Sequence, residues 1–165
     1  MVRGGDMNIF VTSYCPIESA KFLDDKRVNK MCLESAQMLS TALRTLGCED
    51  ERLYKSTHKN HPSCVWVRQS DMNFVWLLAH FEALLDEYEK RRGREHGCSR
   101  LLAAFYANID WLPVGELTDF ANCAANSSLG LSYKHVDDVR LAYQLYLADR
   151  WETDKRAPTW YGLGR

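Results

Sequence analysis

The stretch that decides the fold is "DDKRVNKMCLESAQMLSTALRTLG", residues 24–47. Its apolar and small side chains recur at steps of three and four from Val28 through Leu39 to Leu46, which is the spacing of one face of an α-helix. Gly47 follows and is suited to end a helix. The pattern predicts a helix over 24–46, whose other face carries Arg27, Lys30, Glu34, Gln37 and Thr41.

A second helical pattern follows the polar run "YKSTHKNHP", residues 54–62. Pro62 stands where proline is favoured, at the first position of a helix. Apolar residues then recur at helical spacing as far as Tyr88, and Gly93 is a natural stop. The spacing predicts one continuous helix from Ser63 to about Arg92.

The remaining segments are shorter. "MNIFVTSYCP", residues 7–16, is β-prone but isolated, so we expect it to pack as extended chain. Short helical patterns cover residues 99–109 and 134–151, the second with Arg150 on its apolar side, and residues 117–128 are expected to hold a further turn or two. The predicted class is all-α: a compact single-domain helical bundle over residues 7–165, with an extended N-terminal segment and an irregular C-terminal tail, preceded by a flexible leader at residues 1–6.

Composition limits the function classes. The 165 residues suit one domain, and the net charge of −1 means that any nucleic-acid contact must come from a local patch. The six cysteines contain no CxxC pair, which favours reduced thiols in a cytoplasmic protein. There is no apolar run long enough to span a membrane and no signal-peptide pattern, so we expect no membrane partner.

The polar run before Pro62 holds His58, Asn60 and His61 at the predicted start of a helix. Helix N-termini present unpaired N–H groups, which suit phosphate or carboxylate. A plain helix cap with surface histidines is the alternative. A metal site is a third possibility, because the two histidines and Cys64 are spaced H-x2-H-x2-C, but a second pair of ligands is missing and we expect no metal.

Along the predicted long helix, Trp66, Asn73, His80 and Glu87 stand seven residues apart, with Trp76 between them. Such a stripe is either core packing or the wall of a pocket in which a ring stacks on an extruded base.

Lys30 and Glu34 stand four residues apart on one helix, which commonly means a surface ion pair. In a closed site, however, an amine can form a Schiff base with a sugar aldehyde while the acid moves protons. Dinucleotide-binding, P-loop, nucleophile-elbow and kinase motifs are absent, so nucleotide-cofactor and triad chemistries have no support. Basic residues cluster at 26–30, 55–59, 90–94 and 155–156.

Several of these motifs, in this order, resemble the pyrimidine-dimer DNA glycosylase family, the endonuclease V type of phage enzyme, and its phage-borne relatives. "NIFVTS" precedes a helix bearing "CLESAQML", "HKNHP" precedes an aromatic-rich helix, and "RAPTWYGLG" is similar to the family's Arg-Pro-Thr-Trp-Tyr tail. The resemblance spans most of the chain. It implies a compact all-α DNA glycosylase, often with abasic-site lyase activity, that needs neither metal nor cofactor and works in the cytoplasm, the host's if phage-encoded.

By this resemblance Glu34 is the catalytic acid, and the family's nucleophile is the α-amine of the first residue. Here that amine would lie on the leader, or on Met7 if the chain starts there, so Lys30 or a water activated by Glu34 are the other candidates. The predicted substrate contacts are Arg27, His58, Asn60 and His61 near the entrance, Trp66, Asn73, Trp76 and His80 as pocket wall, and Trp160 and Tyr161 stacking near the opened site.

The sequence thus predicts a DNA repair enzyme that excises a damaged or modified pyrimidine. Two alternatives remain open. One is a non-catalytic nucleic-acid-binding or inhibitor protein on the same scaffold, and the other is an enzyme that modifies a hypermodified base or a nucleotide.

Overall fold

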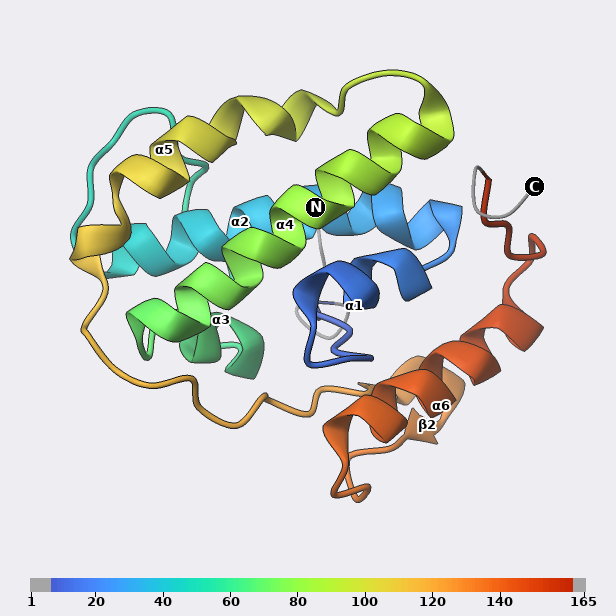
Figure 1. The fold of residues 1–165 in the computed structure, drawn as a ribbon. Coiled ribbons are helices and arrows are strands. Elements are labelled where there is room, and N and C mark those ends of the chain that lie inside the picture. Colours follow the sequence, from blue (N-terminus) through green and yellow to red (C-terminus); the bar gives the residue numbers. More distant parts are fainter. Residues whose placement is uncertain (1–6, 162–165) are drawn as a thin grey trace.

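The computed structural model describes residues 7–161, and its two long helices cross at the centre of the fold (Figure 1). These are α2 (Asp25–Thr45) and α4 (Asp71–Arg92). Two short helices, α1 (Pro16–Phe22) and α3 (Pro62–Val67), pack on α4 and α2 respectively. The predicted all-α class is confirmed, and the predicted leader at residues 1–6 lies outside the described residues.

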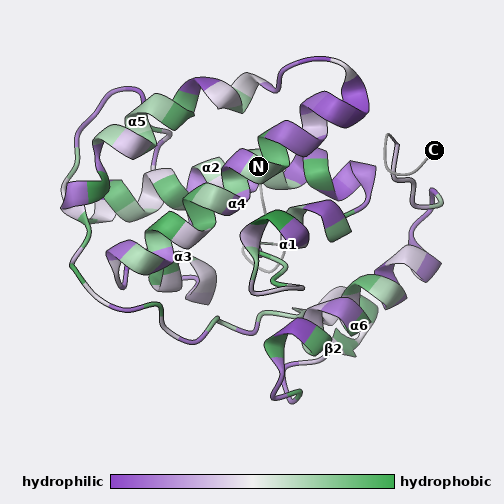
Figure 2. Ribbon diagram, in the orientation of Figure 1, coloured by the Kyte–Doolittle hydropathy of each residue, from purple (hydrophilic) through white to green (hydrophobic). Residues whose placement is uncertain are grey.

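Helix α2 confirms the helix predicted over 24–46, and Gly47 after it adopts a positive φ of 104° that favours glycine. Three residues of its polar face, Arg27, Glu34 and Thr41, are buried. Other elements pack on that face as well as on the apolar one. Figure 2 shows hydrophobic residues concentrated where α2, α3 and α4 meet, with hydrophilic residues toward the C-terminal end of α4.

The prediction of one continuous helix over 63–92 is wrong, because the chain turns between α3 and α4. Ser70 adopts an extended conformation and its hydroxyl accepts a hydrogen bond from the Asn73 backbone N–H at 3.1 Å, so it caps a new helix. The serine and the following Asp71 are ordinary helix-start signals that the apolar periodicity concealed. The predicted stop at Gly93 is confirmed by its left-handed conformation, with φ 72°.

Residues 7–12 are buried and belong to no helix or strand, but the prediction of extended chain is wrong at Phe10, whose φ is 58°. Met7 lies with its sulfur 3.3 Å from Cys64 Sγ on α3, and the Asn8 amide donates to the Cys123 carbonyl at 3.0 Å. Phe10 packs its ring on Tyr146 of the last helix, α6 (Val139–Thr153). Helix α1, which follows, was not predicted, although proline at its first position is a known start signal.

The rest of the chain wraps this centre. A 3₁₀ turn (Gly97–Leu101) leads into α5 (Leu102–Ala107), in agreement with the predicted short helix, and a further 3₁₀ turn covers Ile109–Trp111. The segment expected to hold a helical turn or two instead ends in a small antiparallel hairpin, β1 (Ala125–Asn126) and β2 (Leu131–Ser132), around a 3₁₀ turn (Ser127–Leu129). Helix α6 (Val139–Thr153) starts later than predicted, at its N-cap Asp138.

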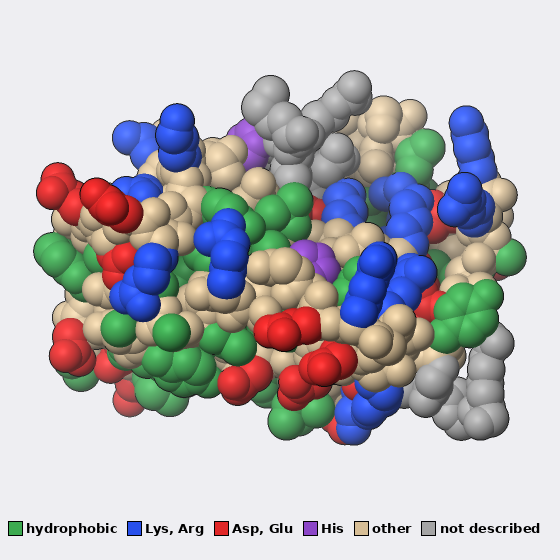
Figure 3. Space-filling model, turned by 90° about the horizontal axis from the view of Figure 1, so that it is seen from above, with side chains coloured by type: hydrophobic (Ala, Val, Ile, Leu, Met, Phe, Trp, Pro, Cys, Tyr) green, Lys and Arg blue, Asp and Glu red, His purple; other side chains and the backbone are tan. Residues whose placement is uncertain are grey.

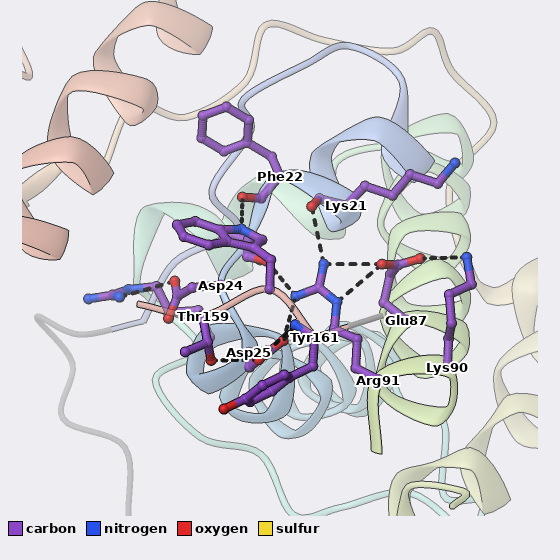
Figure 4. Close-up of polar contacts among 12 residues, drawn as sticks. Lys21, Phe22, Asp24, Asp25, Glu87, Lys90, Arg91, Thr159 and Tyr161 are labelled. Atoms are coloured by element: carbon purple, nitrogen blue, oxygen red, sulfur yellow. Dashed lines mark hydrogen bonds and ion pairs between the residues drawn. The ribbon is translucent and has the colours of Figure 1, made fainter. Parts of the chain in front are cut away.

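The C-terminal tail folds back onto the start of α2 (Figure 4). The Asp25 carboxylate accepts hydrogen bonds from Thr159 Oγ1 at 2.6 Å and from the Tyr161 backbone N–H at 3.0 Å. It also pairs with Arg91 of α4 at 3.2 Å, and the Arg91 side chain, 1 % exposed, bonds Glu87 and two backbone carbonyls. Three distant parts of the sequence therefore meet at one buried carboxylate.

Replacing Asp25 with alanine should lower the free energy of unfolding by about 3 kcal/mol, because it removes one partner of a buried guanidinium and releases the tail. Urea denaturation at pH 7 measures the loss. The matched control is Asp137→Ala, an exposed carboxylate, which should change stability by less than about 0.5 kcal/mol. Equal stability of the two variants would show that the tail contact is not a structural requirement.

Candidate active site

The centre of the candidate site is Glu34, in the middle of α2. Its side chain is 0 % exposed, and its Oε2 lies 3.8 Å from the amine nitrogen of Lys30, one helical turn earlier. The Lys30 side chain is 48 % exposed, so the amine links a buried acid to the surface. Charges attract more strongly where water is excluded, so this pair differs from the ordinary surface ion pair that its spacing suggests.

The stripe of α2 that carries Glu34 ends at the histidine-rich segment. Thr41, two turns further along, accepts a hydrogen bond from the Thr57 backbone N–H at 3.0 Å and donates to the Thr57 carbonyl at 3.3 Å. Seven residues at 1.5 Å each put this contact about 10 Å from Glu34 along the helix. The predicted entrance therefore lies near the acid along α2, but two turns away from it.

Within this segment the three predicted contacts have different surroundings. His61 is the N-cap of α3, and its Nδ1 accepts a hydrogen bond from the Ser63 backbone N–H at 3.1 Å. Partial burial, together with the charges of His58 and Lys134, lowers the pKa of His61 below its ordinary value. His58 is half-buried with a positive φ of 49°, and Asn60 is exposed. The capping interpretation thus describes His61 best.

The predicted pocket wall lies in the core. Trp66 is 2 % exposed, and its ring packs against Trp76 and Phe120. The Trp76 indole N–H donates to the Tyr14 carbonyl at 2.8 Å, and its ring stacks on His80. Because Trp66 belongs to α3 and Trp76 to α4, the residues do not form the single-helix stripe that was expected. The arrangement favours core packing over a base-binding wall.

Asn73 also has a structural environment. It is fully buried; its amide donates to the Trp66 carbonyl and to Thr118 Oγ1, both at 2.8 Å, and its carbonyl oxygen accepts the Thr118 backbone N–H at 2.9 Å. Both halves of the amide are occupied in holding the segment around Thr118 to the α3–α4 corner. Asn73 has no hydrogen-bonding group left for a base.

His80 is 0 % exposed, with Nδ1 2.9 Å from the Pro16 carbonyl oxygen. Burial lowers its pKa to about 4, against the opposing effect of the hydrogen bonds to backbone carbonyls. The neutral imidazole is thus the form that fits the core, and His80 connects α4 to the start of α1.

The remaining predicted contacts anchor the tail and α6. Arg27 is buried and pairs with Asp24 at 3.2 Å and Asp154 at 2.9 Å, which neutralises it. The Trp160 indole N–H donates to the Phe22 carbonyl at 3.1 Å, and its ring meets Trp151 edge-on. Tyr161 is 46 % exposed beside the Asp25 contact. The tail places an aromatic side chain at the surface, next to the start of α2.

A cationic surface that was not predicted from the sequence adjoins the Lys30–Glu34 pair. Three hollows, of about 450, 410 and 40 Å³, share lining residues, and Lys26 lines all of them. We call this surface the cation groove; its cationic residues are Lys26, Arg27, Lys30, Arg92, Arg150, Lys155 and Arg156. Figure 3 shows Lys and Arg side chains gathered toward the right-hand side of one face. Arg150 was visible in the sequence as a cation on the apolar side of a helix.

The carboxylates in this groove do not cancel its charge. Asp24, Asp25 and Asp154 have side chains at most 8 % exposed, and each is paired with a buried arginine. The accessible charge is therefore cationic, although the chain as a whole has a net charge of −1.

The predicted H-x2-H-x2-C metal alternative gains no support. The Cys64 thiol points to Met7, and His61 is engaged as a cap. Within residues 7–161, no three His, Cys, Asp or Glu side chains come together in a way that would hold a metal ion. All six cysteines are free thiols, and no helix in the described part of the chain is both long and apolar enough for a membrane span.

A buried acid with a neighbouring amine, beside a cationic groove, suits a protein that acts on nucleic acid. The profile of the pyrimidine dimer DNA glycosylase family matches residues 7–101, more than half of the 165-residue chain, and the chain belongs to this family. Membership supports a DNA glycosylase function in DNA repair, with DNA as the substrate. The match covers α1 to α4, whereas α5, α6 and the tail follow it. No curated protein and no solved structure matches the chain.

The buried imidazole makes stability depend on pH. Because the folded-state pKa of His80 is about 4 and the unfolded value is 6.5, the unfolded chain binds more protons between these values, and stability falls as the pH falls through this window. Between pH 7 and pH 4.5, the free energy of unfolding of His80→Gln should fall by about 2 kcal/mol less than that of the wild type. Urea unfolding at the two pH values measures the difference. His135→Gln, at an exposed histidine, should keep the wild-type dependence. An unchanged pH profile in His80→Gln would contradict the assignment.

Proposed function

We propose that this protein excises a damaged or modified pyrimidine from DNA, with Glu34 as the general acid and base and Lys30 as a candidate nucleophile. The observation that carries the proposal is the fully buried Glu34 carboxylate, 3.8 Å from an amine that reaches the surface. Glycosidic bond cleavage needs a proton donor for the departing base and a nucleophile at the sugar carbon, and the two groups are of these types.

With an amine as nucleophile, the nitrogen attacks C1′ of the target deoxyribose. Before the attack, the ammonium passes a proton to the Glu34 carboxylate, which leaves a neutral amine beside a protonated acid. The bond from C1′ to the base then breaks, and the base leaves with the electron pair and takes the proton from Glu34. The attached nitrogen next gives a proton to Glu34, which passes it to O4′ as the C1′–O4′ bond breaks and the C1′=N bond forms. The resulting Schiff base on the opened sugar permits loss of the C2′ proton to Glu34 and cleavage of the C3′–O bond, which is abasic-site lyase chemistry. With water as nucleophile, Glu34 removes the water's proton and an intact abasic site remains.

The α-amine of the chain is the third candidate nucleophile. If the chain starts at Met7, the amine belongs to the buried segment beside α3, because the Met7 side chain is 1 % exposed and contacts Cys64. The Thr57 carbonyl that Thr41 binds lies 3.9 Å from the same Cys64 sulfur, so this segment reaches the far end of the α2 stripe that carries Glu34.

DNA contacts in this proposal come from the cation groove, which reaches Glu34 through Lys30. Lys and Arg side chains attract phosphates without regard to sequence, as a repair enzyme that scans DNA requires. His58 and Asn60 stand at the other end of the α2 stripe and would contact the backbone or the base there. Tyr161, exposed beside the groove, would stack on an unpaired base.

Glu34→Gln tests the acid. It keeps the size of the side chain but removes its ability to transfer protons, so base release from a duplex with one thymine dimer should fall about a hundredfold or more while DNA binding is retained. Release is measured by chromatography, and binding by fluorescence anisotropy. Glu49→Gln, at an exposed glutamate, is the matched control. Base release at the wild-type rate in Glu34→Gln would reject Glu34, and no base release by wild type on dimer or modified DNA would reject the glycosylase proposal.

The substitution Lys30→Arg distinguishes a role of Lys30 as nucleophile from a role as a positive charge. Arginine keeps the positive charge beside Glu34 but does not form a Schiff base, so if Lys30 is the nucleophile the covalent adduct trapped by borohydride should disappear while affinity stays within about threefold. The adduct is seen as a shifted protein band, and Lys21→Arg on α1 is the control. A trapped adduct that persists in Lys30→Arg would exclude Lys30, and peptide sequencing of that adduct would show whether the terminal amine carries it.

A further inference from the structure

The smallest hollow of the cation groove has features that DNA scanning does not require. It holds about 40 Å³ between α2, α6 and the N-terminal segment, and it is lined by Phe10, Lys26, Arg27, Lys30, Tyr146 and Arg150. A water molecule takes about 30 Å³, so the hollow accepts the oxygens of a small group but not a sugar or a base. Its polar lining consists of four cations and a phenol.

Arg150 has a donor with no acceptor. Its Nη1 donates to the Tyr146 hydroxyl at 2.9 Å, and its Nη2 lies 3.7 Å from Asp154. Its Nε is buried and has no hydrogen-bond partner among the described residues. Leaving a buried donor unpaired costs about 1–3 kcal/mol, so such groups are rare and commonly mark a place that a ligand fills.

Phe10 supplies an independent sign of function at the same place. Its φ of 58° lies in the left-handed region, where a bulky side chain is an outlier, and its ring is fixed by Tyr143 and Tyr146 of α6. Backbone strain of this kind costs about 1–3 kcal/mol and is concentrated at ligand sites. The strained residue thus forms part of the wall of the hollow, together with the cations.

Charge counting identifies the ligand. Arg27 pairs with Asp24 and Asp154, Arg150 also lies near Asp154, and Lys30 pairs with Glu34. The four cations of the hollow thus face three carboxylates, which leaves one positive charge in excess. A singly charged anion with several strong acceptor oxygens and a small radius balances this excess and can accept hydrogen bonds from the Lys26, Lys30 and Arg150 side chains.

We propose that this hollow is a clamp for a single phosphate, the phosphodiester next to the nucleotide whose base is removed. The assignment rests on the proposed function. Lys30 connects the two places, because it lines the hollow and lies 3.8 Å from Glu34. A phosphate held there brings the adjoining sugar up to the carboxylate, and the wider groove carries the neighbouring phosphates past Lys155 and Arg156. Positioning of the sugar thus comes from one fixed phosphate on α2 and α6.

The test uses a duplex with one tetrahydrofuran abasic analogue, so that it does not depend on the identity of the lesion. In a series of duplexes, one phosphate at a time near the analogue is replaced by a neutral methylphosphonate. Binding is measured for wild type, Arg150→Met and Arg150→Lys, with Arg140→Met as the matched control. Arg140 lies ten residues earlier on α6, about 15 Å away, paired with Asp138.

Arg150→Met should weaken binding of the unmodified duplex about ten- to hundredfold and lower the salt dependence by about one phosphate contact. Arg150→Lys should recover only part of the loss, because it restores the charge but not the planar set of guanidinium donors. At one linkage beside the analogue, the methylphosphonate should weaken DNA binding by the wild type as much as the Arg150→Met substitution does. The same methylphosphonate should have little further effect on DNA binding by Arg150→Met. Arg140→Met should bind like wild type.

Two results would overturn the clamp. One is a methylphosphonate penalty that is the same for wild type and Arg150→Met at every linkage. The other is thermal stabilisation by inorganic phosphate that is lost in Arg150→Met while DNA binding is unchanged, which would assign the hollow to a free phosphate. In either case the wild type would still release the base. Failure of the proposed function, by contrast, would be seen as the absence of base release, independently of the clamp.

Discussion

The enclosure of α2 is the constraint on which the rest of this structure depends. Helix α4 crosses it, α3 packs beside it, and Arg27 joins it to the end of α6, so that few of its side chains are left at the surface. A helix enclosed in this way cannot place all its charged groups in water, and each buried charge then needs a partner. Asp25 has Arg91 and the tail, Arg27 has two aspartates, and Glu34 has Lys30 within 3.8 Å.

These pairs are not equivalent. Arg91 and Asp25 are closed on all sides by carbonyl groups, a hydroxyl and one another, and their chemistry is complete within the fold. Glu34 differs because its cationic neighbour is half exposed and lines a hollow. The same physical demand, that a buried charge be compensated, thus produces a rigid joint at one end of α2 and an accessible acid in its middle. The candidate chemistry is located at the second.

Much of this arrangement follows from sequence, and the failures have identifiable causes. Apolar periodicity predicted α2 and the stop at Gly93, because three-four spacing and a glycine after it are local signals. The same periodicity concealed the corner at Ser70, since apolar spacing continues across it while the cap depends on one hydroxyl. The sequence also could not show whether Trp66, Trp76 and His80 are buried or exposed. A stripe of aromatic and amide side chains has the same spacing whether it packs against a base or against Phe120. The meeting of Lys26 with Arg150 required the tertiary fold, because more than a hundred residues separate them.

The docking of the tail on α2 has a consequence for how such chains change over time. The matched family region ends at residue 101, yet the two aspartates at the start of α2 accept hydrogen bonds from the Trp151 indole, the Thr159 hydroxyl and the Tyr161 backbone N–H, all beyond that limit. A substitution at either aspartate alters the fit of a segment some 130 positions away. Exchange of C-terminal segments between relatives should therefore keep this contact only when the start of α2 is exchanged with them, so the start of α2 and the tail form one structural unit.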